Sequence, residues 1–308
     1  MTEQLRGVFA IPPTPFTGDG ALDEAGLRRV VRFCVDAGAH GIVTPVNASE
    51  FAFLTDAERQ RVVEIACAEA GGAVPVVAGV AGTCTEHALV FAAHARTVEA
   101  DAVIAMPPYL RTAGRREIHH YYEAIARTVE RPVFIQNHQP PQGTVLSPDL
   151  VAELVDEIPH VEYVKEECWP PGHHLSAELE RCGPRLRGIM GGIAGRYLLD
   201  EYRRGACGTM PACEIADLHA QLWERLERDD ELGARQLFDA MLPLLNLEGM
   251  HGVVLYKYVL QRRGLIESTT VRQPGLWQLD AHDVAEIDAV LDRLQSLFRL
   301  AAPAQAGG

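Results

Sequence analysis

Residues 41–81, GIVTPVNASEFAFLTDAERQRVVEIACAEAGGAVPVVAGVA, have the pattern of a strand, a helix and a second strand. The runs Gly41–Val46 and Pro75–Ala81 are short and apolar, whereas Thr55–Ala70 has the length and polarity of an amphipathic helix. Two parallel strands need a crossover of about a dozen residues or more, usually a helix. The stretch therefore predicts a unit of two parallel strands covered by a helix.

The same alternation recurs on both sides of this unit, with helical patterns such as Asp23–Ala37 and Thr85–Glu99 between apolar runs. Eight such units fit an α/β fold of the TIM type, a closed (β/α)8 barrel. An open, doubly wound sheet is the alternative, although no Gly-x-Gly-x-x-Gly sequence follows the first strand. The predicted strands are Gly7–Thr14, Gly41–Val46, Pro75–Ala81, Ala102–Pro107, Pro132–Asn137, Val161–Glu166, Leu186–Gly191 and Gly205–Pro211.

The pattern after the eighth strand is helical only, which predicts a C-terminal helical extension. We expect a barrel over residues 1–213, a helical region packed on it over residues 214–300, and a flexible tail over residues 301–308. The predicted C-terminal helices are Asp217–Arg228, Glu231–Leu245, Gly252–Arg263 and Ala281–Leu300.

Composition excludes several classes of partner. The formal net charge of −14 argues against a broad surface for nucleic acid or anionic lipid. No apolar run reaches about 18 residues, so no membrane helix is expected. Seven cysteines without a Cys-x-x-Cys pair, and a start (MTEQLRGVFA) without a secretory pattern, predict a cytoplasmic location. The histidine pairs at 119–120 and 173–174 are adjacent, which does not place two imidazoles on one helix face, and we expect no metal site.

Lysine occurs only at positions 165 and 257. Lys165 ends the apolar run V-E-Y-V-K, at the end of a strand where barrel enzymes build their active sites. Unlike arginine, lysine can be neutral when buried, and its amine can then attack a carbonyl carbon. The alternative is a structural lysine paired with Glu166 or Glu167. Lys257, in the helical pattern VVLYKYVLQRR, is predicted to be a surface or subunit-contact residue.

Several motifs extend along nearly the whole chain in a specific order. They are GVFAIPPTPF (7–16), GIVTPVNASE (41–50), LTDAER (54–59), PVVAGV (75–80), MPPY (106–109), VKEE (164–167) and GACGTMPA (205–212). Together they resemble the dihydrodipicolinate synthase and N-acetylneuraminate lyase family. The resemblance implies a lyase that binds a small 2-oxo acid as a Schiff base on Lys165, without another cofactor, in a homo-oligomer, usually a tetramer.

The resemblance also assigns a role to residues 46–50, which match the family's Gly-Thr/Ser-Thr-Gly-Glu loop. That loop binds the substrate carboxylate through amides and hydroxyls. Here it reads V-N-A-S-E, so Asn47 and Ser49 offer polar side chains and Ala48 offers only its amide. The alternative is that Asn47 and Ser49 cap a loop and the next helix.

Three departures from the family pattern bear on the reaction. Gln136-Asn137-His138-Gln139 replaces the usual Tyr-Asn-x-Pro, and glutamine cannot relay a proton as tyrosine can. Leu110 replaces a second tyrosine after Tyr109, and PPQG (140–143) lacks the arginine of the dicarboxylic aldehyde-binding synthases. The lysine-pathway synthase activity is therefore not expected, and the chain looks most like the branch of 2-keto-3-deoxy sugar-acid dehydratases.

An enamine on Lys165 can lose a C4 hydroxyl, as in a dehydratase, or form by C3–C4 cleavage, as in an aldolase. Dehydration is the preferred prediction; an aldolase and a non-catalytic barrel are the alternatives. Either reaction needs a proton carrier, for which the sequence offers His138, Glu50, Glu166 or a bound water. The remaining predicted site residues are Gln136, to orient a water or hydroxyl, Tyr109, to reach the same space, and Gly191 and Gly192, to permit close approach of the substrate.

Overall fold

The computed structural model describes residues 4–139 and 144–300, and its strands form a closed parallel barrel in the order β1 to β8. This topology confirms the predicted (β/α)8 fold and excludes the open sheet. The strand residues are buried apart from Glu162, as expected of a parallel sheet covered by helices. The strands are β1 Gly7–Ala10, β2 Gly41–Thr44, β3 Val76–Gly79, β4 Ala102–Ala105, β5 Val133–Asn137, β6 Val161–Glu166, β7 Gly188–Gly191 and β8 Gly208–Thr209.

The eighth strand is shorter than the predicted run from Gly205 to Pro211, because β8 covers only Gly208 and Thr209. Gly205 has a φ of +101°, a conformation that turns the chain where a strand would extend it. A Cβ atom at Gly208 would be 2.2 Å from the carbonyl oxygen of Gly7. Glycine is therefore required at position 208 to let the two backbones approach.

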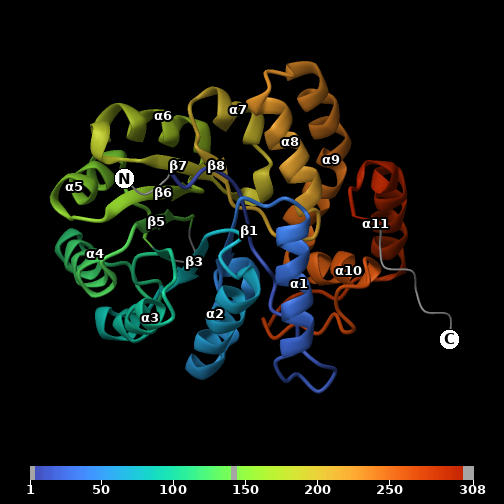
Figure 1. The fold of residues 1–308 in the computed structure, drawn as a ribbon, viewed down its shortest axis with the longest axis horizontal. Coiled ribbons are helices and arrows are strands. Elements are labelled where there is room, and N and C mark those ends of the chain that lie inside the picture. The colour runs from blue at the N-terminus through green and yellow to red at the C-terminus, as the bar shows by residue number, and fades with distance from the viewer. Residues whose placement is uncertain (1–3, 140–143, 301–308) are drawn as a thin grey trace. The chain divides into compact units, whose positions relative to one another are not determined.

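The chain divides into two compact units, of which the first consists of Met1–Gly7 and Pro75–Met210. In this unit helices α3 to α6 each pack against the next (Figure 1). Helix α4 is held by two buried tyrosines: the Tyr121 hydroxyl accepts the Gly82 N–H at 3.0 Å, and the Tyr122 hydroxyl donates to Ala105 O at 2.8 Å. The helices of this unit are α3 Thr85–Thr97, α4 Arg115–Val129, α5 Pro148–Glu157, α6 Pro171–Cys182, η3 Gly183–Arg185, η4 Ile193–Gly195 and α7 Leu198–Arg203.

The second unit consists of Val8–Val74 and Pro211–Gly308, and it contains the C-terminal helical extension, which is confirmed. In it α9 packs against α8, α10 and α11. The domain boundary after residue 213 stays a prediction, and the predicted tail 301–308 lies outside the described residues. The helices of this unit are α1 Glu24–Asp36, η1 Asn47–Ser49, η2 Phe51–Phe53, α2 Asp56–Ala70, α8 Ala216–Glu227, α9 Glu231–His251, α10 Val253–Arg262, α11 Ala281–Leu294 and η5 Gln295–Leu297.

The C-terminal helices differ from their predicted bounds at two ends. Helix α9 continues to His251, past the predicted end at Leu245, and includes Pro243. Helix α11 ends at Leu294, short of the predicted end at residue 300. The chain leaves the helix because the N–H groups of residues 299 and 300 donate to the buried Asp217 carboxylate, at 3.0 and 3.4 Å. Within the described residues, no helix has the length and apolar character that a membrane span requires.

Candidate active site

Strand β6 ends in Lys165 and Glu166, and Glu167 follows directly, so the three charged side chains alternate between the two faces of the strand. Lys165 is 3% exposed, and its neighbours in the sheet are Gln136 on β5 and Met190 on β7. Because successive side chains of a strand point to opposite faces, Lys165 and Glu167 share one face while Glu166 takes the other. Only Glu167, of the two glutamates, is therefore placed to meet the Lys165 amine.

The Glu167 carboxylate is the centre of the polar contacts around Lys165. Its Oε1 atom lies 3.3 Å from Lys165 Nζ, and it also accepts the Ile193 N–H at 3.3 Å. Its Oε2 atom accepts Gln136 Nε2 at 2.8 Å. Gln136 thus binds the carboxylate beside the lysine, and the pairing of Lys165 with one of the adjacent glutamates is a fact of the structure. That pairing fits a structural lysine as well as a reactive one.

The charge state of Glu167 follows from its surroundings. Burial alone would raise the pKa of its carboxyl, but the positive charges of Lys165 and His138 and the hydrogen bonds from Gln136 and Ile193 together lower the pKa below its ordinary value. At neutral pH Glu167 is consequently a carboxylate. A buried anion that touches an amine can accept a proton from that amine or from an adjacent carbon.

Glu166 belongs to a separate group of carboxyls on the other face of β6. It accepts Asn137 Nδ2 at 2.8 Å and the Cys168 N–H at 2.5 Å. Burial raises the pKa of Glu166, and burial together with the charge of Glu166 raises the pKa of Glu178 to about 10. Glu178 is therefore protonated at neutral pH. These bonds hold the ends of β5 and β6 together and face away from the Lys165 amine.

His138 and Tyr109 lie in loops after β5 and β4. The His138 ring is half-buried, and its Nδ1 atom donates to Gln139 O at 2.7 Å. Its contribution to the low pKa of Glu167 places its charge near the site. Tyr109 is half-buried, whereas the adjacent Leu110 is 74% exposed.

Gly191, the last residue of β7, and Gly192, which follows it, make room for carboxylates. A Cβ atom at Gly192 would lie 2.4 Å from Oε1 of Glu167, and one at Gly191 would lie 1.9 Å from Oε2 of Glu201. The sequence predicted these glycines as places where a substrate approaches the backbone. The structure gives Gly192 a direct function of another kind, since it leaves the space that the Glu167 side chain fills.

We therefore expect Gly192→Ala to displace Glu167 from Lys165. The clash involves a buried carboxylate held by three contacts, so the substitution should destabilise the fold by about 1–3 kcal/mol and lower turnover. Thermal unfolding and a steady-state assay would measure the two effects. Gly114→Ala is the matched control, because its Cβ would come no closer than 3.4 Å to another heavy atom. Normal turnover of a folded Gly192→Ala protein would show that the position of Glu167 is unimportant.

The predicted carboxylate-binding residues lie in the second unit, in and around the short helix η1. Ser49 is fully buried; its hydroxyl donates to Pro12 O at 2.7 Å, and its N–H donates to Val46 O at 2.9 Å. Its carbonyl accepts the Thr14 hydroxyl at 2.6 Å. Asn47 and Ala48 are half-exposed. Ser49 thus fixes the loop, while Asn47 and Ala48 form its more accessible part.

The prediction that Lys257 lies at the surface or in a subunit contact is wrong. Its side chain is fully buried, with Nζ 2.5 Å from Oε1 of Glu50 and 2.7 Å from Thr270 O. Burial lowers the pKa of Lys257 to about 8, although the charge of Glu50 opposes the change. Glu50, which the sequence offered as a proton carrier, is held in this ion pair with Lys257.

Sequence reasoning omitted Glu167 from the site, although a signal for it was present. In a strand, the residue two places after a lysine shares its face, so V-K-E-E already pointed to the second glutamate. No group of three or more His, Cys, Asp or Glu side chains among residues 4–139 and 144–300 is arranged to hold a metal ion. The chemistry that remains is that of a buried amine, a carboxylate and an amide.

Comparison with known proteins agrees with this geometry. Residues 4–293 match the model of the dihydrodipicolinate synthetase family. The L-2-keto-3-deoxyarabonate dehydratase of Azospirillum brasilense is 30% identical over 302 residues, which is 96% of each chain. The 4-hydroxy-tetrahydrodipicolinate synthase of a Chelativorans species is 30% identical over 93% of this chain and 97% of its own. The crystal structure of dihydrodipicolinate synthase from Rhodopseudomonas palustris has a TM-score of 0.86 at 27% identity, over 94% of this chain and 97% of that one.

Proposed function

The chain belongs to the dihydrodipicolinate synthetase family of lyases, and from that premise we propose that it dehydrates a 2-keto-3-deoxy sugar acid through an enamine on Lys165. The observation that carries the proposal is the contact of Lys165 with Glu167, with Gln136 bonded to the same carboxylate. Gln136 stands where the family has its proton-relaying tyrosine, and a carboxylate occupies the adjoining space. Glu167 can therefore carry a proton in this site, although the tyrosine is absent.

The first step forms the Schiff base. Neutral Lys165 attacks C2 of the 2-oxo acid, and the carbonyl oxygen leaves as water after it gains two protons, which gives an iminium cation. Glu167 is within reach of Nζ and can take the proton that the amine releases on attack. Because the iminium nitrogen is a cation beside an anion, the same carboxylate also stabilises the charge that develops.

The second step uses the acidity of C3 in the iminium. C3 is two bonds from Nζ, so a carboxylate 3.3 Å from Nζ lies close to a C3 hydrogen. Glu167 takes that proton, and the electron pair moves toward nitrogen to give the enamine. The enamine electrons then expel the C4 hydroxyl, which leaves as water with the proton from Glu167. Hydrolysis of the unsaturated imine releases the dehydrated 2-oxo acid and restores Lys165.

We assign the segment Asn47–Ser49 to the substrate carboxylate because it matches the family's binding motif, with Asn47 and Ala48 as the donors. Ser49, whose hydroxyl and N–H both donate to backbone carbonyls, holds the segment in place. Gln136 is proposed to hold Glu167 in place, and His138 to add positive charge near it. Tyr109, Gly191 and Gly192 remain proposed substrate-binding residues. A homotetramer and the absence of a cofactor other than the covalent imine are likewise proposals by resemblance. A cytoplasmic location is a proposal from the spacing of the cysteines.

Two named relatives indicate different reactions, and the residues of this chain favour the dehydratase. The chain has Leu110 and Gln136 where tyrosines stand in the synthases, and its loop after β5 lacks their arginine. A 2-oxo-acid aldolase is the second candidate, since Glu167 could instead take a proton from a C4 hydroxyl and drive C3–C4 cleavage. A non-catalytic barrel is the third.

A product assay separates the three. The protein is mixed with several 3-deoxy-2-oxo pentonates and hexonates, and the products are followed by mass spectrometry. We expect loss of one water with all carbons retained. Pyruvate and a shorter aldehyde would show an aldolase instead, and no product with any substrate would support the non-catalytic alternative.

A further inference from the structure

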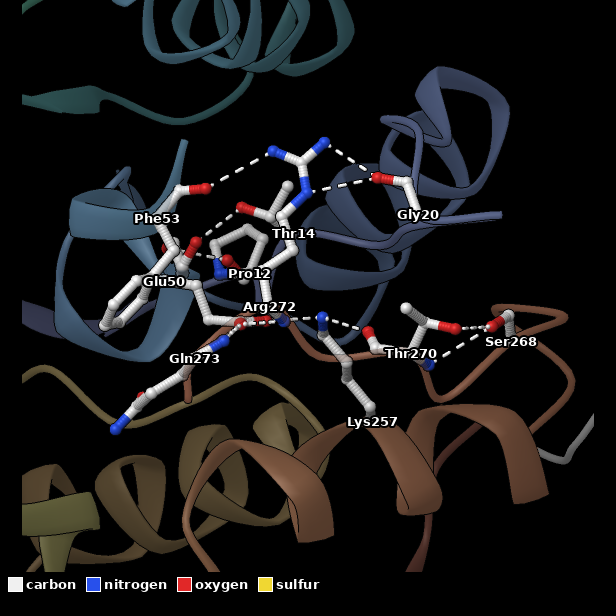
Figure 2. A network of polar contacts seen from close by, with 11 residues as sticks. Pro12, Thr14, Gly20, Glu50, Phe53, Lys257, Ser268, Thr270, Arg272 and Gln273 are labelled. Carbon is white, nitrogen blue, oxygen red and sulfur yellow. Dashed lines mark hydrogen bonds and ion pairs between the residues drawn. The ribbon is translucent and has the colours of Figure 1, made fainter. Parts of the chain in front are cut away.

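The loop after β2 is held by a buried network of polar contacts that the proposed mechanism does not use (Figure 2). At its centre is Glu50, which is 1% exposed and has a φ of 56°, in the left-handed region that residues other than glycine rarely adopt. Glu50 ends η1 and precedes η2, so its conformation sets the direction of the chain on both sides. A strained backbone of this kind persists only where its surroundings hold it.

Three donors hold the Glu50 carboxylate. Lys257 Nζ reaches Oε1 at 2.5 Å, while Oε2 accepts the N–H groups of Arg272 and Gln273 at 2.7 and 2.9 Å. Lys257 comes from α10 and residues 272–273 from the segment after it, so the C-terminal extension supplies every one of these donors. A buried carboxylate with three donors is fixed in one position.

The same C-terminal segment also binds the chain on the C-terminal side of Glu50. The Arg272 guanidinium donates to Phe53 O at 3.3 Å and to Gly20 O at 2.8 Å (Figure 2). It also donates to both carboxylate oxygens of Glu58 at 2.7 Å. The loop is thus bound at Glu50 and again just beyond η2. The residues directly before Glu50 are Asn47, Ala48 and Ser49.

We propose that the ion pair of Lys257 with Glu50 positions the loop after β2, which makes Lys257 a positioning residue for the segment Asn47–Ser49. The inference rests on the proposed function, because that function assigns the segment to the substrate carboxylate. The fully buried Lys257 ammonium lies 4.2 Å from the centroid of the Phe16 ring, and its contact with Glu50 spans 207 positions of sequence. Burial of the Lys257 ammonium has a large desolvation cost. The attraction of Glu50 offsets this cost only while the loop after β2 keeps its conformation.

The first test measures binding. Wild type and Lys257→Met are incubated with increasing pyruvate, the adduct is trapped with borohydride, and its amount is read by intact mass. We expect the half-saturating pyruvate concentration to rise about tenfold or more in Lys257→Met, and KM with the sugar-acid substrate to rise in parallel, while kcat changes less than about threefold. A folded Lys257→Met protein with an unchanged half-saturating concentration would overturn the inference.

Two further variants guard against simple loss of stability. Glu50→Gln/Lys257→Met removes both charges yet keeps an oxygen for the two N–H donors, and we expect it to recover most of the lost affinity. Tyr258→Phe is the matched control on the same helix, because it removes only the 2.8 Å bond from the Tyr258 hydroxyl to Asp288. A Tyr258→Phe protein that loses affinity as Lys257→Met does would reduce the role of Lys257 to general support of α10.

Hydrogen exchange tests the position of the loop without any ligand. Peptides that cover residues 46–54 are expected to exchange faster in Lys257→Met and at the wild-type rate in Tyr258→Phe. Unchanged exchange in Lys257→Met would refute the positioning role even if Lys165 forms its adduct. If the wild type forms no adduct but exchange of these peptides is faster in Lys257→Met, the proposed function fails and the positioning role of Lys257 stands.

Discussion

Lys165→Ala is expected to form no borohydride-stable adduct with pyruvate or 2-oxobutyrate and to lose turnover by at least about a thousandfold. The reason is that no other lysine can replace it: the chain contains one other lysine, Lys257, which is fully buried in an ion pair with Glu50. Intact mass after reduction, followed by peptide mapping, would locate the adduct. An adduct of undiminished yield in the variant would end the Schiff-base proposal.

Lys165→Arg is the control for charge. The alanine variant leaves Glu167 buried without its ion-pair partner, which can cost about 3–5 kcal/mol of stability and confuse a loss of activity with a loss of fold. Arginine keeps a cation beside Glu167 but cannot form an imine. We expect Lys165→Arg to unfold at a higher temperature than Lys165→Ala and to be equally inactive. Turnover by the arginine variant would mean that Lys165 serves only as a charge.

Glu167→Gln is expected to retain the trapped adduct while turnover falls by about 10²–10⁴-fold, the range usual for loss of a general acid-base group. Glutamine keeps the shape and an oxygen for the Gln136 amide but cannot carry a proton. Single-turnover measurements with substrate that carries deuterium at C3 would show whether proton removal has become the slow step. Slow turnover together with retention of deuterium at C3 of the recovered substrate would support Glu167 as the group that removes the C3 proton.

Glu166→Gln is the matched control, since it neutralises the neighbouring buried carboxyl on the other face of β6. We expect it to change turnover by less than about threefold, because Glu166 is bonded to Asn137 and faces away from the amine. A Glu166→Gln protein as inactive as Glu167→Gln would indicate that any change of charge at the end of β6 disables the site.

The sequence was sufficient for the fold and for the place of Lys165. Apolar runs separated by helical patterns set the barrel, and β6 has the predicted bounds Val161–Glu166. The start of β8 was misplaced because the turn at Gly205 depends on a backbone angle, which composition does not encode. The last turns of α9 were missed because they contain Asn246 and Gly249, which have low helix propensity.

The candidate site was predictable only in part, for reasons that differ between residues. Glu167 follows from the two-residue period of a strand, yet its hydrogen bond from Gln136 joins positions 31 residues apart. Lys257 was misplaced because helical periodicity predicts one apolar face and says nothing of a carboxylate 207 positions away. Long-range pairs of this kind need the tertiary structure.

The placement of both lysines has a practical consequence for covalent chemistry. Lys165 is 3% exposed and Lys257 is 0% exposed, and every other basic residue apart from histidine is arginine. Reagents that couple to lysine amines, such as activated esters and bulky cross-linkers, therefore find no exposed side chain on this protein, and attachment to a solid support must use another group. A small amine-directed aldehyde, in contrast, would label Lys165 with almost no labelling of other side chains, so Lys165 allows selective covalent modification of the protein.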